Sequence, residues 1–117
     1  MRLWTRLEPL LWLLFVAGGA AGALLLPAGS FAFGIAFPAG WFGDAAESYA
    51  RLRALLASAG VQVLLAALQS LIFWHAAHRL RHLLRTFGVE REALTCTGCY
   101  GLAVLASAAA FVVWLRI

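Results

Sequence analysis

The stretch PLLWLLFVAGGAAGALLLPAGSFAFGIAFPAGWFG, residues 9–43, contains no charged side chain. About 20 consecutive apolar residues cross the hydrocarbon core of a bilayer, so this run can hold one tilted or kinked membrane-spanning helix followed by an apolar tail. Pro27 is the predicted kink, because proline removes a backbone donor from a helix. Pro38, followed by Trp41, marks the predicted exit at the membrane surface.

A secretory signal peptide is the alternative interpretation of this first run. Arg2 and Arg6 precede the apolar residues, and the small residues 17–23 resemble a cleavage region. The apolar sequence nevertheless continues for about twenty residues beyond that point, which favours a retained span. Gly18 and Gly22 also form a small-xxx-small pair, which predicts close approach of a neighbouring helix.

Two further uncharged runs follow, at residues 54–74 and 97–115. The whole chain is 64% apolar and 12% charged, against about 25% charged in a typical soluble domain. We therefore predict an all-α membrane protein with a single domain, residues 1–117, and three transmembrane helices at about 9–37, 48–85 and 97–115. The stretch from Asp44 to Arg53 is expected as a short surface loop. Gln62 and Gln69 in the second run are expected to face protein, because an amide facing lipid is costly.

Arginine distribution predicts the orientation of the spans. All nine basic residues are arginine. In a three-span chain the N-terminal segment and residues 75–92 lie on one side and hold six of them, whereas three lie on the other side. The positive-inside rule then places the N-terminus in the cytoplasm and the C-terminus in the periplasm. The arginines lie at the ends of apolar runs, where they meet lipid phosphates, so the net charge of +4 does not indicate a nucleic-acid partner.

Cys96 and Cys99 form one C-x-x-C pair. A single pair supplies only half of a tetrahedral metal site, so we expect no metal there. Both cysteines lie in a stretch of small residues, where a thiol most often packs as a compact apolar group.

The polar centre of the chain is residues 75–92, which hold all three histidines. Residues 74–85 contain no glycine or proline and should continue the second helix into the interface. At 100° per residue His75, His78, Arg79 and His82 share an arc of about 100°, with Arg81 beside it. Glu8 and Pro9 suit the start of the first helix, and Trp12 should lie at the same depth as the histidines.

Three interpretations of this histidine face remain open from the residues. It can simply anchor a helix end at the headgroups, as arginine and histidine often do. It can bind a quinone, whose carbonyl oxygen becomes more negative on reduction and is then stabilised by a guanidinium. Finally, His75 lies close enough to the buried span to ligate a b-type haem, given a second axial ligand from another helix or chain.

Three motifs together resemble a known family. They are Glu-Pro-x-x-Trp-x-x-Phe-x-x-Gly-Gly at residues 8–19, Phe-Gly-Asp-Ala with a following tyrosine at residues 42–49, and Trp-x-x-x-His-Arg-x-x-His at residues 74–82. Their order and spacing are similar to those of the small hydrophobic D-type anchor of bacterial quinol:fumarate reductase over nearly the whole chain. Arg81 departs from that pattern, which often has a further histidine at this place.

The resemblance implies a non-catalytic anchor in the inner membrane. It would tether a flavoprotein and an iron-sulfur subunit together with a second small anchor, and would contribute to a quinone site, most naturally for menaquinone, in anaerobic respiration. The family's site-lining roles fall on Trp12 and Arg79, with His78 and His82 adjacent. The resemblance also implies no haem; a haem-bearing anchor of succinate dehydrogenase is the alternative function, and a small membrane protein unrelated to respiration is a third.

Overall fold

The computed structural model describes the backbone of residues 2–117 and the side chains of residues 9, 10 and 12–117. The described residues form α1 (Arg2–Phe31), the π-helical turn η1 (Ala32–Ala36), α2 (Ala45–Leu56), α3 (Ala59–Thr86) and α4 (Glu92–Trp114). The side chains of Arg2, Arg6 and Glu8, on which part of the topology and helix-start predictions depend, lie outside the described residues.

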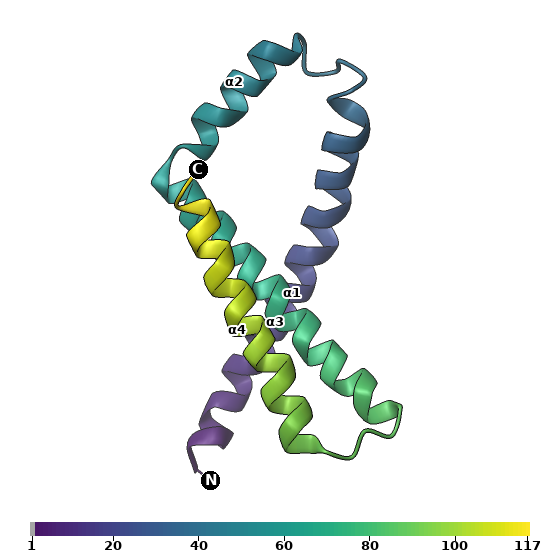
Figure 1. The fold of residues 1–117 in the computed structure, drawn as a ribbon. Coiled ribbons are helices and arrows are strands. Elements are labelled where there is room, and N and C mark those ends of the chain that lie inside the picture. Colours follow the sequence, from purple (N-terminus) through teal and green to yellow (C-terminus); the bar gives the residue numbers. More distant parts are fainter. Residues whose placement is uncertain (1) are drawn as a thin grey trace.

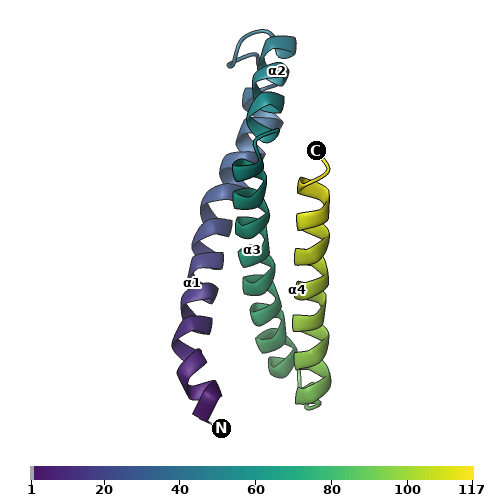
Figure 2. The same ribbon diagram turned by 90° about the vertical axis from the view of Figure 1, so that its left-hand side faces the viewer.

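Three of these helices are long and apolar enough to cross a membrane, over Trp12–Ala36, Ala59–Thr86 and Glu92–Trp114. The prediction of an all-α chain with three candidate spans is thus confirmed. Both α1 and α4 pack against α3, which lies between them in Figure 2. The start of α1 and the α3–α4 connection lie at one end of the bundle, whereas α2 and the C-terminus lie toward the other (Figure 1). The orientation in the bilayer stays a prediction.

Within the stretch from Asp44 to Arg53, residues 45–53 are helical, so the prediction of a surface loop is wrong. Residues 45–56 contain no glycine or proline and are rich in alanine, leucine, glutamate and arginine, which are good helix formers. Asp44 precedes the helix in an extended conformation, as expected of an N-cap residue. Ser58, also extended, then separates α2 from α3, so residues 48–85 comprise two helices instead of one.

The first helix continues through Pro27 as α-helix, and its irregular segment lies one turn later. In η1 the Phe37 amide donates to the Ala32 carbonyl at 2.9 Å, an i→i+5 bond. Such a turn is a common local response to disruption of the helical hydrogen-bond ladder. Pro38 follows in the turn that leaves the helix, and Gly40 and Gly43 adopt positive φ there, which glycine accepts without steric cost.

Small residues form the contacts between the helices. The buried apolar side chains are alanines at 36, 66, 77, 103 and 110 together with Cys99, and no large side chain among the described residues is fully buried. Cys99 packs with Ala77 and Ala103, as the sequence predicted for a compact thiol. Most leucine, valine and phenylalanine side chains lie on the outside, which is the expected distribution for helices surrounded by lipid or by partner helices.

Glycine sets the contact between α1 and α3. A Cβ atom built on Gly18 would lie 2.1 Å from the Leu71 backbone oxygen, whereas one built on Gly22 would meet Ile72 at 3.8 Å. The predicted glycine pair therefore lies on the face that approaches a neighbouring helix, and Gly18 is the point of closest approach.

Candidate functional site

His75 joins the ends of α1 and α3. Its Nδ1 atom lies 2.9 Å from the backbone oxygen of Phe15, and its ring stacks on the Phe15 ring with centroids 4.4 Å apart. The imidazole covers Gly19, since a Cβ built there would lie 2.8 Å from His75 Cε1 and 3.6 Å from Nε2. His75 therefore packs against the backbone of α1 and acts as a contact between helices.

His78 lies one turn further along α3 and joins α3 to α4. Its Nδ1 atom is 2.9 Å from the hydroxyl of Tyr100 on α4. Its Nε2 atom is 3.1 Å from Nε2 of His82, and the two rings meet edge to face. Both nitrogens of His78 therefore make contacts within the chain. His82 is exposed, and of the four ring nitrogens of the two histidines only its Nδ1 atom takes no part in these contacts.

Phe15 connects the tryptophan of α1 to the histidines of α3. Trp12, 62% exposed, meets Phe15 edge to face at 5.9 Å between centroids, and the Phe15 ring also lies 4.6 Å from the His78 ring. Trp12, His78 and His82 consequently belong to one continuous aromatic and imidazole cluster. Its exposed members carry the indole N–H and an imidazole nitrogen, the kinds of group that bind a ring bearing carbonyl oxygens.

The arginines of this end have different surroundings. Arg79, which follows His78 in the sequence, is exposed. Arg81 is less exposed, and its Nη2 donates to Glu92 Oε1 at 2.7 Å. Arg85 lies 3.5 Å from the same carboxylate oxygen, so Glu92 at the start of α4 holds the end of α3.

Sequence reasoning quoted Phe15 within a motif but gave it no role in the site, and it missed Tyr100 and the pairing of Arg81 with Glu92. Phe15 follows Trp12 by three residues, a spacing that places both on one face of α1 and was a usable signal. Tyr100 had a weaker signal, as the one hydroxyl-bearing aromatic residue in an otherwise small and apolar stretch. Nothing in the sequence paired it with His78, because that contact depends on how α3 and α4 pack.

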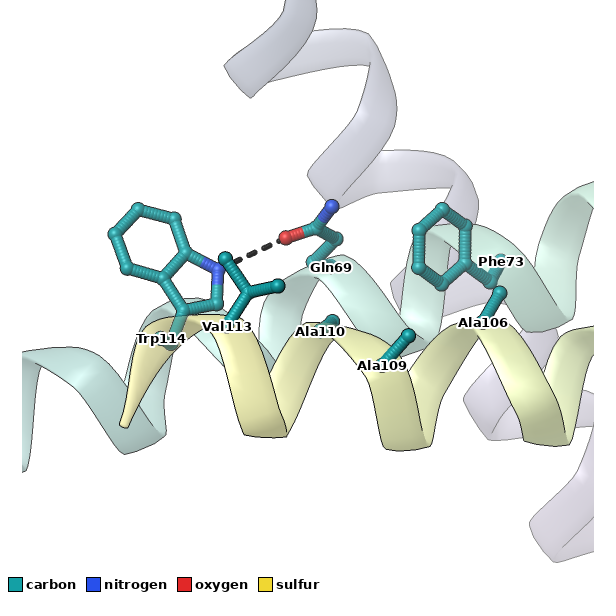
Figure 3. A pocket seen from close by; sticks show the side chains of 7 residues that line it. All are labelled: Gln69, Phe73, Ala106, Ala109, Ala110, Val113 and Trp114. Carbon is teal, nitrogen blue, oxygen red and sulfur yellow. Dashed lines mark hydrogen bonds between the residues drawn. The ribbon is translucent and has the colours of Figure 1, made fainter. Parts of the chain in front are cut away.

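A groove lies between α3 and α4, away from the histidine cluster. This open groove of about 310 Å³ is lined by Gln69 and Phe73 on α3 and by Val113, Trp114 and three alanines on α4 (Figure 3). The Trp114 indole donates to Gln69 Oε1 at 2.9 Å. Gln62 is buried. Both glutamines therefore face protein, as the sequence predicted, and the groove has few polar groups beyond the paired Gln69 and Trp114.

A bundle of three candidate spans, with an arginine-rich, aromatic and imidazole cluster at one end, defines a polytopic membrane anchor in which nearly every residue belongs to a helix. Comparison with known proteins is specific. The family model for the D subunit of fumarate reductase matches residues 4–115. This chain belongs to that family, whose members are membrane anchor subunits of fumarate reductase.

Several similar relatives carry the same description. The fumarate reductase D subunit of Mycobacterium tuberculosis is 40% identical over 88% of this chain and 82% of its own length. The corresponding protein of Photobacterium profundum is 34% identical over 90% of this chain and 88% of its own. That of Vibrio vulnificus is 33% identical, with coverage of 90% and 84%. The similarity therefore extends over most of the length of both partners in each comparison.

Proposed function

We propose that this chain anchors the catalytic subunits of fumarate reductase at the inner membrane and contributes a quinone-binding surface at the histidine end of its bundle. The catalytic partners would be a flavoprotein and an iron-sulfur protein on the cytoplasmic side, with a second small anchor beside this one. The chain itself carries no chemistry on fumarate. Its share of the reaction is to hold menaquinol where electrons can pass to the partner's clusters.

The observation that carries the proposal is the cluster formed by Trp12, Phe15, His78 and His82. It joins α1 to α3 at the end of the bundle that also bears Arg79. An amphipathic ring at headgroup depth would meet exposed aromatic surface, an indole donor and an imidazole within one region. The groove at the other end offers mostly apolar side chains and no cation among its lining residues.

Arg79 supplies the charge in this arrangement. It is exposed on α3 and follows His78 in the sequence, so its guanidinium can donate to the oxygen of a ring that approaches from the lipid or from a partner subunit. Because the oxygen carries more negative charge in reduced forms that have lost a proton, a fixed guanidinium favours those forms over the neutral oxidised ring. This chain would thus bind the quinone and stabilise the negative charge on its oxygen.

A haem-bearing anchor receives no support from His75. Its Nδ1 atom bonds to the Phe15 carbonyl and its ring stacks on Phe15, so His75 has a structural role that needs no haem. A six-coordinate b-type haem would also need a second axial ligand from another helix or chain. A reduced-minus-oxidised optical spectrum of the purified complex tests this point, and a haem band lost in a His75 variant would contradict it.

The decisive variant for the proposed function is Arg79→Leu in the assembled complex. Removing a charge-assisted hydrogen bond is worth about 1.5–3 kcal/mol, so menaquinol-linked fumarate reduction should fall by about 10- to 150-fold. Fumarate reduction driven by an artificial donor should persist, because that route bypasses the quinone. The matched control is Arg53→Leu, an exposed arginine on α2 near the opposite end, which should change neither activity. Unchanged quinol-linked turnover in Arg79→Leu would refute this role.

A further inference from the structure

Tyr100 lies behind the exposed histidine and forms a connected set of hydrogen-bonding groups with it. The members are the Tyr100 hydroxyl, His78 and His82, with a 2.9 Å contact from Tyr100 to His78 and a 3.1 Å contact between the two imidazoles. His82, the last member, is exposed, whereas Tyr100 and His78 are half-buried.

The donor capacity of these groups gives the set a direction. A phenol O–H is the stronger donor of this pair and a neutral imidazole nitrogen is the stronger acceptor, so the Tyr100 O–H points to His78 Nδ1. His78 Nδ1 must then be the unprotonated nitrogen, and its proton lies on Nε2. One proton fits between the two Nε2 atoms, so His82 Nε2 accepts it and the remaining His82 proton lies on Nδ1.

We infer that Tyr100 is a positioning residue that fixes the tautomer of His82, so that His82 presents an Nδ1–H donor to an oxygen of the bound quinone. This inference rests on the proposed function, because it assumes that a quinone ring lies against the exposed cluster. His78 then contacts no quinone oxygen itself, since both of its nitrogens are engaged within the chain. Tyr100 fixes the tautomer of His78 at the α3–α4 contact, and His78 in turn fixes the tautomer of the exposed His82.

The variant that tests the inference is Tyr100→Phe, which removes the hydroxyl and keeps the ring that packs 5.5 Å from Trp74. Without the hydroxyl, His78 can donate from Nδ1 or Nε2, and His82 no longer holds a single tautomer. One neutral hydrogen bond to the quinone is worth a factor of about two to ten in affinity. In the assembled complex, KM for a short-chain naphthoquinol should rise by up to that factor, because the donor tautomer of His82 is then populated only part of the time, whereas artificial-donor fumarate reduction should stay unchanged.

A double-mutant cycle separates positioning from packing. In a His82→Ala background, Tyr100→Phe should cause no further rise in KM, because the group through which Tyr100 acts is gone. The control is Tyr49→Phe, which alters the only other tyrosine, an exposed one on α2, and should leave KM as it is. An unchanged KM in Tyr100→Phe, or an equal rise with and without His82, would overturn the inference.

The outcomes also distinguish this inference from the proposed function. If His82→Ala leaves KM unchanged while Arg79→Leu and Trp12→Ala impair quinol-linked turnover, the tautomer role of Tyr100 is refuted and the quinone site stands. If all three variants retain full quinol-linked turnover and KM, both fail. Parallel loss of the artificial-donor activity in Tyr100→Phe would show that its hydroxyl is needed for assembly, which also contradicts a role confined to His82.

Discussion

Gly18 is the residue at which the packing of this bundle can be tested most sharply. A Cβ atom at this position would lie 2.1 Å from the Leu71 backbone oxygen, 2.8 Å from the Leu71 carbonyl carbon and 3.0 Å from His75 Cβ. Carbon and oxygen atoms approach to roughly 3.3 Å without repulsion, so Gly18→Ala requires α1 and α3 to separate by about 1 Å. The obstruction is backbone, which cannot move aside by changing rotamer.

The magnitude follows from two opposing effects. Overpacking of this kind costs about 1–3 kcal/mol, and the displaced His75–Phe15 bond adds about 1 kcal/mol. Alanine gains about 1 kcal/mol over glycine through helix propensity. Gly18→Ala should therefore lower the free energy of unfolding by about 1–3 kcal/mol. Gly22→Ala is the matched control, because its Cβ would meet Ile72 at 3.8 Å, an ordinary contact, and it should be neutral or slightly stabilising.

The assay is loss of helical circular dichroism when the purified chain in mild detergent is titrated with a denaturing detergent. The level of assembled complex in membranes gives an independent measure. Gly18→Ala should shift the unfolding midpoint to lower denaturant and reduce assembly, whereas Gly22→Ala should do neither. If the two variants behave alike, α1 and α3 do not approach through Gly18, and the placement of His75 against α1 would have to be abandoned.

Two further predictions concern the α3–α4 contact. Trp114→Phe should destabilise the chain by about 1 kcal/mol, because Gln69 loses its indole donor beside an apolar groove. The double variant Gln69→Leu, Trp114→Phe should be less destabilised than the sum of the two single variants. Additive effects in the same titration would contradict a direct bond. In the detergent-solubilised chain a maleimide should label Cys96, which is partly exposed, much faster than Cys99, which is buried against Ala103. Mass spectrometry of single-cysteine variants measures both rates. Equal rates would show that α4 is rotated from the position described above.

The uncharged runs predicted the three long helices because hydrocarbon thickness leaves few alternatives for a chain so poor in polar groups. Runs of about 20 apolar residues between arginine-rich segments are a strong signal. The α2 segment was harder to predict. Its charged residues indicated a surface position correctly, but surface position does not distinguish a loop from a short helix, and the helix-forming composition of residues 45–56 had to be weighed separately.

The sequence could predict which site residues share a face of one helix, but not which residues of different helices contact one another. Helical spacing placed His78, Arg79 and His82 on one face, and the resemblance added Trp12. Neither could show that His75 faces α1, that Tyr100 bonds His78, or that Arg81 turns to Glu92. Those contacts are set by the rotation and separation of neighbouring helices, which depend on small residues such as Gly18 and Cys99 more than on the polar residues themselves.

The most direct test of a quinone site at the histidine end is to locate a photoreactive naphthoquinone in the assembled complex. After irradiation, peptide mapping should find label on residues of α1 near Trp12 and on the last turns of α3, and excess menaquinone should abolish it. Label confined to the groove beside Gln69 and Trp114, or absent from this chain while a partner is labelled, would contradict a quinone site at the histidine end.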